Sequence, residues 1–453
     1  MDTKKLRQKI LDLAIRGKLV SQDPNDEPAS VLLERIKAEK ERLIKEGKIK
    51  RSKKSARTSD TPHYENVPFE VPDNWVWTTL GEVGTWQSGG TPSRSNKTYY
   101  GGNIPWLKTG DLNDGFISDI PESITEEAVA KSSAKINPTG SVLIAMYGAT
   151  IGKLGILKFP ATTNQACCAC IEFNAITQLF LFYFLLSQRN EFIAKGGGGA
   201  QPNISKEIIV NTFIPLPPLT EQQRIVAEIE HWFALLDKIE QEKSSLQNII
   251  KQTKSKILDL AIHGELVPQD PNDEPAIELL KRVNPDFTPC DNGHYQQLPE
   301  GWQIASMQTL CNLIDGEKQR GIERINLDVK YLRGERDAKK LMAGKYITAN
   351  SLLILVDGEN SGEVFSTPVD GYQGSTFKQL CINDNMNTDY VLQVIKFHRK
   401  TLRENKVGSA IPHLNKKMFR AIEVPIPPYH EQLRIVDAIN ITFKHLDTIM
   451  ESL

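Results

Sequence analysis

The chain contains nearly the same segment twice. KILDLAIRGKLVSQDPNDEPA occupies residues 9–29 and KILDLAIHGELVPQDPNDEPA occupies residues 256–276, with 18 identities in 21 positions at an offset of 247. Each copy has the pattern of an amphipathic helix end, a glycine stop and a polar turn. Because equivalent segments fold into equivalent structures, this repeat constrains the fold more than any other feature of the sequence.

Three further matches follow in the same order along the chain. They pair VPDNWVWTTL (71–80) with LPEGWQIASM (298–307), GSVLIAMYGATIGK (140–153) with NSLLILVDGENSGE (350–363), and IPLPPLTEQQRIVAEI (214–229) with VPIPPYHEQLRIVDAI (424–439). The repeated unit is far longer than those of solenoid proteins, so the chain is a tandem duplication.

The duplication predicts two similar globular domains of mixed α/β fold, separated by long helices. Each domain combines strand-like runs, glycine turns and one helix-like segment, at residues 175–195 and 387–405. We predict an N-terminal helix at 1–29, a basic linker at 30–66, a first domain at 67–218, a central helix at 219–276, a second linker at 277–297, a second domain at 298–428 and a C-terminal helix at 429–453.

Apolar residues at alternating steps of three and four predict a coiled-coil seam in these helices, because a period of 3.5 residues keeps one helix face against its partner. The predicted seam comprises Leu6, Ile10, Leu13, Ile225, Ile229, Trp232, Leu236, Ile239, Leu246, Ile250, Ile257, Leu260, Ile435, Ile439, Leu446 and Ile449.

The second long helix is interrupted by the chain ends. It stops at Leu453, about halfway along, and the missing half matches residues 1–17 at the N-terminus. We therefore expect a circularly permuted arrangement with two antiparallel long helices and pseudo-twofold symmetry. Cysteines placed at Leu6 and Leu453 would test whether the two halves of the second helix meet.

Composition indicates a soluble globular chain without a membrane partner. It is 40% hydrophobic and 25% charged with a net charge of −1, and its longest apolar run, Leu179–Leu186, is too short to cross a bilayer. The six cysteines form no C-x-x-C pair, so we expect buried, reduced thiols and a cytoplasmic location. Two segments are basic: residues 37–57 and 318–345, the latter with nine basic and four acidic residues.

No motif predicts a catalytic centre. GATIGKL (148–154) has neither the spacing nor the Ser or Thr of a phosphate loop, and neither H-E-x-x-H nor G-x-S-x-G occurs. We expect no catalytic residue, no metal site and no cofactor in this chain.

Taken together, these motifs resemble the specificity subunit of type I restriction–modification systems across essentially the whole chain. The resemblance rests on the duplicated KILDLAI segments, on SGGTPSRSNKTYYGGNIPWLKTGDL (88–112), and on the paired PLPPLTEQQRIV and PIPPYHEQLRIV. It implies a non-enzyme in which each globular domain reads one half of an asymmetric bipartite target in double-stranded DNA. The helices would set the spacing and dock two modification (methyltransferase) subunits.

The resemblance also assigns the chemistry to partners. S-adenosylmethionine would be bound by the modification subunits. ATP and Mg would serve separate restriction/translocase subunits, which join through the complex.

Divergence within the duplication marks the segments that are free to read different targets, mainly residues 88–102 and 315–340. Arginine suits guanine edges, lysine suits phosphates, and glutamine pairs with adenine. The predicted DNA-binding residues are Thr91, Ser93, Arg94, Lys97, Tyr99, Tyr100, Gln165 and Gln201 in the first domain, and Lys318, Gln319, Arg320, Arg333, Arg336, Lys339, Lys340 and Gln379 in the second.

Two other functions remain open from the residues alone. A coiled-coil scaffold with two protein-binding domains would have the same helices, but its binding would not weaken steeply with added salt. A fused methyltransferase–nuclease would need a cofactor motif and a longer chain.

Overall fold

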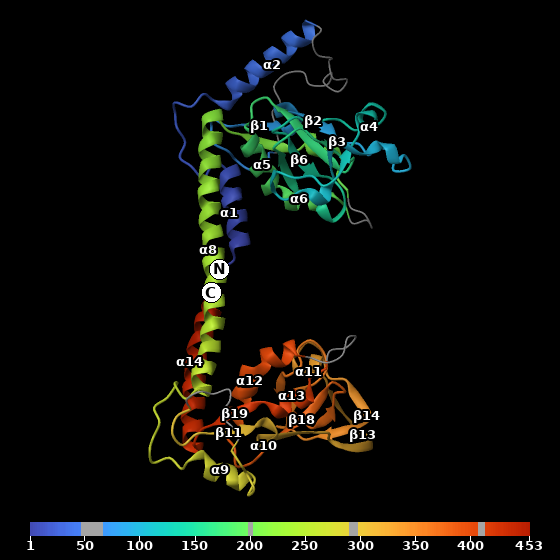
Figure 1. The fold of residues 1–453 in the computed structure, drawn as a ribbon. Helices are drawn as coiled ribbons and strands as arrows, with labels where there is room; N and C mark the ends of the chain where they lie inside the picture. The colour runs from blue at the N-terminus through green and yellow to red at the C-terminus, as the bar shows by residue number, and fades with distance from the viewer. Residues whose placement is uncertain (47–66, 198–202, 290–297, 406–412) are drawn as a thin grey trace. The chain divides into compact units, whose positions relative to one another are not determined.

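The duplication in the sequence is present in the structure as two units built from the same elements. The structure is a computed structural model, and it describes residues 1–46, 67–197, 203–289, 298–405 and 413–453 (Figure 1). The units comprise residues 1–241 and 242–453, and the long helix α8 (Leu219–Ile262) contributes to both.

Unit 1 contains α1 (Thr3–Ile15), α2 (Ala29–Lys45), β1 (Val76–Thr79), α3 (Leu80–Val83), β2 (Gly84–Ser88), η2 (Lys97–Tyr99), β3 (Tyr100–Leu107), η3 (Thr109–Asp111), β4 (Gly115–Ile117), β5 (Ser123–Ile124), α4 (Glu126–Ala130), β6 (Val142–Ala145), η4 (Gly148–Thr150), β7 (Leu154–Leu157), β8 (Thr162–Thr163), β9 (Cys167–Phe173), α5 (Gln178–Ser187), α6 (Arg189–Lys195), α7 (Lys206–Val210), β10 (Phe213–Leu216) and the first half of α8.

Unit 2 contains the second half of α8, α9 (Ala276–Val283), β11 (Gln303–Ser306), α10 (Met307–Leu310), β12 (Cys311–Ile314), β13 (Glu317–Leu327), α11 (Val329–Leu332), β14 (Lys340–Ile347), β15 (Leu352–Leu355), β16 (Val364–Ser366), β17 (Gly371–Gln373), β18 (Phe377–Ile382), α12 (Thr388–Glu404), α13 (Lys416–Ala421), β19 (Glu423–Ile426) and α14 (Tyr429–Ser452).

A common sheet forms the framework of both units. Its strand order is β2-β9-β6-β7 in unit 1, where β4 extends it, and β12-β18-β15-β16 in unit 2. The buried central strands β6 and β15 are the repeated apolar runs that the sequence predicts as strands. Side chains from both faces of this sheet enter separate cores, so each unit has the mixed α/β fold expected from the sequence.

A short antiparallel ribbon closes each domain next to its long helix. β1 pairs with β10, with Val76 opposite Leu216, and β11 pairs with β19, with Gln303 opposite Ile426. The ribbon brings the start of each domain beside its end, and the prolines that follow β10 and β19 end the strand at the entrance to α8 and α14. Each domain is therefore anchored at the N-terminal end of a long helix.

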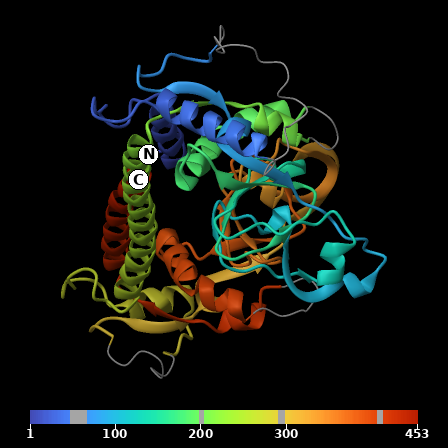
Figure 2. The same ribbon diagram turned by 90° about the horizontal axis from the view of Figure 1, so that it is seen from above.

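Within each unit this long helix pairs with an antiparallel neighbour. In unit 1, Arg7 of α1 forms an ion pair with Asp237 of α8, at 2.6 Å. In unit 2, Lys254 of α8 forms an ion pair with Asp447 of α14, and α14 lies along α8 in both views (Figures 1 and 2). The duplicated arrangement predicted from the sequence is confirmed, unit by unit.

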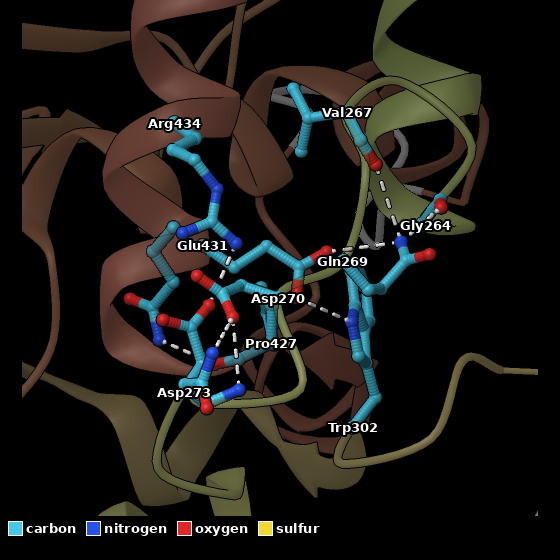
Figure 3. A network of polar contacts seen from close by, with 11 residues as sticks. Gly264, Val267, Gln269, Asp270, Asp273, Trp302, Pro427, Glu431 and Arg434 are labelled. Carbon is cyan, nitrogen blue, oxygen red and sulfur yellow. Dashed lines mark hydrogen bonds and ion pairs between the residues drawn. The ribbon is translucent and has the colours of Figure 1, made fainter.

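A buried polar network joins the repeated turn to the helix start in each unit. In unit 2, the carboxylate of Glu431 accepts hydrogen bonds from Trp302 Nε1 at 3.1 Å and from Gln269 Nε2 at 3.2 Å, and Arg434 pairs with Asp273 (Figure 3). Unit 1 repeats these contacts with Glu221, Trp75, Gln22, Arg224 and Asp26. The duplicated QDPNDEPA and EQ-x-RIV motifs therefore have a structural role.

Gly264 allows the chain to turn between helix and network. Its φ is +75°, a left-handed conformation that favours glycine, and a Cβ there would lie 2.4 Å from Cγ of Pro299. Gly17 has the same environment in unit 1, with a φ of +66° and Pro72 at 2.4 Å. This explains why both copies of the repeated segment have glycine at this position.

The predicted seam is wrong at several positions. Leu6, Trp232, Ile239 and Ile449 are exposed, at 38%, 42%, 41% and 45%. Phe233 and Phe443 turn toward the core instead, because each domain packs against its helix and widens the buried face beyond a two-helix seam. Buried seam residues are Ile225, Ile229, Leu236, Ile250, Ile257, Ile435 and Ile439, and the partly buried ones are Ile10, Leu13, Leu246, Leu260 and Leu446.

Both predicted linkers begin as helices. α2 (Ala29–Lys45) covers the start of the first linker, and α9 (Ala276–Val283) covers the start of the second. Each buries an alanine and a leucine at equivalent positions, Ala29 with Leu33 and Ala276 with Leu280. The basic stretch at 47–66 lies outside the described residues. The first predicted domain helix is divided into α5 and α6 at Gln188, whereas α12 is continuous.

Cysteines in the described chain are free thiols. Cys167, Cys168, Cys170 and Cys311 are buried and Cys381 is half-buried, while Cys290 lies outside the described residues. Burial raises the pKa of Cys168 and Cys311 to about 12, which disfavours the reactive thiolate. Among the described helices, none is apolar over a length sufficient to cross a membrane.

Candidate nucleic-acid interface

The two units differ most at one place in the framework. In unit 1 the chain between β2 and β6 forms a glycine-rich loop, η2, β3, β5 and α4, whereas in unit 2 the chain between β12 and β15 forms the β13–β14 hairpin with α11. The flanking strands are equivalent in the two sheets. Divergence is thus concentrated in an insertion that both units carry at the same position.

The insertion of unit 2 forms a groove of about 910 Å³. β13 and β14 supply one wall through an antiparallel ladder that pairs Lys318 with Lys345 and shifts register between Arg320 and Arg324. The other side is formed by α11 and the turn after β17. The lining residues are Lys318, Gln319, Arg320, Asn326, Asp328, Val329, Lys330, Arg336, Lys339, Leu341, Ala343, Gly344, Lys345, Gln373, Gly374, Ser375 and Thr376.

The groove is strongly cationic. Of its charged lining residues six are basic and one, Asp328, is acidic. Asp328 pairs with Arg336, and Lys345 pairs with Asp315 at 2.8 Å. Within the part of the chain that the structure describes, no carboxylate pairs with the remaining four basic residues, Lys318, Arg320, Lys330 and Lys339. An uncompensated row of this kind attracts a polyanion.

Hydrogen bonds hold the base of the groove rigid. Gln373 Nε2 donates to Asp315 at 3.0 Å, and Gln373 Oε1 accepts from the backbone N–H of Gly316 at 3.0 Å. Desolvation alone would raise the pKa of Asp315, but hydrogen bonds from Lys345, Lys378 and Gln373 outweigh it and hold the pKa well below its usual range. Asp315 therefore stays ionised and positions Lys345.

Gln319 is the groove residue best suited to read a base. Its side-chain oxygen is buried and has no hydrogen-bond partner among the described residues. An amide with unsatisfied polar capacity in a cationic groove can form the paired donor and acceptor contacts that adenine accepts.

Five of the eight residues predicted in the second domain line the groove: Lys318, Gln319, Arg320, Arg336 and Lys339. The other three do not. Arg333 is held by Glu363, Lys340 pairs with Glu323 at 2.8 Å, and Gln379 lies in β18 between β12 and β15. The sequence did not indicate which side of a strand Lys340 and Gln379 would occupy, or that Arg333 would lie at the end of a helix.

In unit 1 the divergent loop is held by packing around Arg94. Its guanidinium lies over the rings of Tyr100 and Trp106, at 4.5 and 4.8 Å, and donates to Glu122 at 3.2 Å. Tyr100 donates its hydroxyl to the carbonyl of Pro92 at 2.6 Å. Arg94 and Tyr100 therefore shape the loop, which leaves a smaller set of side chains to contact a ligand.

The remaining candidates of unit 1 lie at or near the surface. Lys97, Ser93 and Gln165 are exposed, and Thr91 and Tyr99 are partly buried. Ser93 shares a hydrogen bond with Ser95 at 2.7 Å. Gln201 lies outside the described residues. Unit 1 thus presents an exposed loop where unit 2 presents a groove.

Sequence reasoning missed part of the groove. Lys330, Lys345 and Asn326 lie within the basic segment and line the groove. The sequence did not indicate that α11 would bring Lys330 to the groove, or that the strands β13 and β14 would turn Asn326 and Lys345 toward it. Ser375 and Thr376 also line the groove, and the repeat could have predicted the position of Ser375. Gln165, a predicted residue, corresponds to Ser375 at the repeat offset of 210.

A second surface lies on the first half of α8. Trp232, Leu235 and Ile239 are each at least 40% exposed and lie on one helical face, at positions i, i+3 and i+7. Large apolar side chains in such a row are typical of protein docking surfaces. We call these three residues the apolar stripe.

Among the described residues, no group of three or more His, Cys, Asp or Glu side chains is placed to hold a metal ion.

Two copies of one α/β framework, each with its own divergent insertion, define the class of a duplicated recognition protein. The family model described as the type I restriction modification DNA specificity domain matches residues 72–248 and 299–452. The chain therefore belongs to the type I restriction–modification DNA specificity family.

Two relatives from Escherichia coli are similar over much of the chain. The type I restriction enzyme EcoAI specificity subunit is 31% identical over 69% of this chain, and the EcoEI specificity subunit is 33% identical over 70%. The match spans 63% and 59% of these two relatives.

Solved structures share the fold. The HsdS subunit from Thermoanaerobacter tengcongensis has a TM-score of 0.52 at 19% identity, with 85% of this chain and 93% of that chain covered. A chain from a study of assembly and conformational transition of the type I R-M system has a TM-score of 0.58, also at 19% identity, with 85% and 94% covered.

Proposed function

We propose that this chain reads an asymmetric, two-part sequence in double-stranded DNA, one part by each unit, and performs no catalysis itself. The observation that carries the proposal is the position of the divergence. A framework shared by both units carries different insertions at the same place. In unit 2 that insertion forms a cationic groove, in which the amide oxygen of Gln319 has no hydrogen-bond partner among the described residues.

Different side chains of the groove would contact the phosphates and the bases of the DNA. Lys318, Lys330 and Lys339 supply charge for phosphates, whereas Gln319 and Arg320 have the planar donors that distinguish base edges. In unit 1, Lys97 and Gln165 take the corresponding roles on the loop side. Because the two sets of side chains differ, the two target halves differ.

The partners follow from the family and from the apolar stripe. We propose that two modification subunits dock on the helices, and that restriction/translocase subunits join through the complex. S-adenosylmethionine, ATP and Mg would be bound by those partners, and the chain would contribute target choice alone. The apolar stripe is the surface that favours such docking over an isolated chain.

Selection from random DNA tests the proposal. The chain, purified with a modification subunit of its own restriction–modification system, is mixed with duplexes that carry a random core, and bound molecules are sequenced. We expect a motif of two specified parts separated by a fixed number of unspecified pairs, with affinity that falls steeply with salt. Binding without an enriched motif, or indifference to salt, would favour the scaffold function.

A further inference from the structure

A basic surface continues from the groove of unit 2 across α12. Arg333, at the C-terminal end of α11, and Arg399 of α12 both pair with the single carboxylate of Glu363. Lys396, one turn before Arg399 on α12, has no carboxylate partner in the described part of unit 2. These three residues, Arg333, Lys396 and Arg399, are here called the α12 track.

The α12 track carries a net positive charge because its three cations pair with only two acids. Arg333 and Arg399 share Glu363, and Arg333 also pairs with Glu335 at 3.9 Å. Burial lowers the pKa of Lys396, and the charges of Lys254 and Arg399 lower it further, while Asp447 opposes them. The ammonium group is thus among like charges, and an added anion would relieve their repulsion.

The surroundings of the track are also incompletely bonded. Arg399 Nε and Gln393 Oε1 are buried without a hydrogen-bond partner among the described residues, and both residues line a groove of about 370 Å³ between α12 and β16. Arg399 uses one Nη for Glu363, at 3.3 Å. Arginine also presents its N–H donors in a planar fork, a geometry suited to phosphate oxygens.

Geometry joins the track to the recognition groove at one end and to the helix pair at the other. Lys330 of α11 lines the groove, and Arg333 follows it by three residues. At the other end, Lys396 Nζ lies 4.7 Å from the ring centre of Phe443 on α14. Figure 1 shows α12 between α11 and α14 within this unit.

We infer that the α12 track binds the phosphate backbone of the DNA that leaves the recognition groove, independently of its sequence. This inference rests on the proposed function, and it adds a contact with the unspecified spacer. Phosphate contacts of this kind position a protein on DNA and raise affinity without adding specificity.

The test compares Lys396→Gln with a matched control, Lys400→Gln. Lys400 lies one turn further along α12, is 86% exposed and pairs with Glu404 at 3.9 Å. Each variant is purified as the full chain with its modification subunit. Affinity is measured by fluorescence anisotropy at several salt concentrations, for a duplex with the selected motif and for one of equal length without it.

Lys396→Gln is expected to weaken both duplexes by the same factor and to reduce the salt slope by about 0.9, the value for one phosphate contact. Lys400→Gln should match the wild type. A Lys396→Gln complex that binds with wild-type affinity and slope would overturn the track. Loss of the modification subunit from the Lys396→Gln complex would also overturn the inference, because it would show that the track contacts that subunit rather than DNA.

A third variant separates this result from the proposed function. Gln319→Ala should lower the preference for the motif over the unrelated duplex while it keeps the salt slope. If the wild type has no sequence preference, the proposed function fails. If the preference is present but Lys396→Gln behaves as the wild type, the track alone fails.

Discussion

At the scale of single residues, the two buried glutamates fix the domains to the helices. Glu221 and Glu431 are 0% and 1% exposed, and each accepts from a tryptophan and a glutamine of the same unit. Without an acceptor, the Trp302 and Gln269 donors would be buried and unpaired. Sequence reasoning identified the motifs that supply these residues but not their contacts, because the partners lie more than a hundred positions apart.

Glu431→Ala is expected to lower the free energy of unfolding by about 1–3 kcal/mol, the cost of leaving buried donors unsatisfied. Glu431→Gln retains one carbonyl oxygen and should lose less. Urea unfolding followed by tryptophan fluorescence measures both. Equal losses in the two variants would show that packing rather than hydrogen bonding explains the effect.

The same carboxyl group predicts a pH dependence. Burial raises the pKa of Glu431 above its ordinary 4.5, although hydrogen bonds from Gln269 and Trp302 oppose the rise. Below 4.5 both folded and unfolded chains bind the proton, so the full contribution to stability is present. As pH rises through the folded pKa, the unfolded chain releases its proton first and that contribution is lost.

The stability of Glu431→Gln relative to the wild type should therefore increase from pH 4.5 toward neutral pH. Thermal unfolding of the pair across that range measures the difference. A difference that stays constant would contradict the raised pKa.

At the scale of elements, the sequence predicts the repeated helices and strands, but it does not predict which face of each long helix is buried. The sequence indicates the strands, the helix breaks at the prolines and the glycine stops, because these depend on local chemistry. The prediction is wrong at Trp232. The 3.5-residue period places this residue in the seam, but its side chain is exposed and Phe233 packs against the domain instead. A 3.5-residue period describes the buried face of a helix that packs against one neighbouring helix. Here each long helix also packs against a globular domain, which buries a wider face.

Gly264→Ala should destabilise unit 2. The left-handed backbone alone costs an alanine roughly 1–2 kcal/mol, and Pro299 would have to move as well. Gly148→Ala is the control, since its φ is +65° with nothing within 4 Å of the new Cβ. The loss of unfolding free energy should be larger for Gly264→Ala than for the control. Similar losses of unfolding free energy in the two variants would show that the contact with Pro299 does not contribute to the destabilisation.

The apolar stripe predicts separate effects on folding and assembly. Trp232→Glu should change the free energy of unfolding by less than about 0.5 kcal/mol, because the side chain is exposed, yet it should abolish co-purification with the modification subunit. Gln241→Glu places the same charge on the opposite, exposed face of α8 and should leave assembly intact. Retention of the subunit by Trp232→Glu would place docking elsewhere.

At the scale of the whole molecule, the duplication distinguishes the framework that both units share from the insertions that differ between them. The framework recurs because both units must fold and join a long helix in the same way. The insertions differ, and their structure could not be predicted in detail: the sequence indicated a basic, divergent segment, whereas the β13–β14 ladder decides which side chains enter the groove. Arg333 and Lys340 were expected to bind DNA together with Lys318, and of these three only Lys318 lines the groove.

The most direct test of the central claim is a map of methylated bases in a host that expresses the chain with its modification subunit, repeated with Gln319→Ala. For the wild type we expect methylation at one asymmetric motif of two parts. For the variant we expect relaxed specificity in one part, with the other part unchanged. Methylation without such a motif, or a variant that alters both parts equally, would contradict the claim that each unit reads its own half.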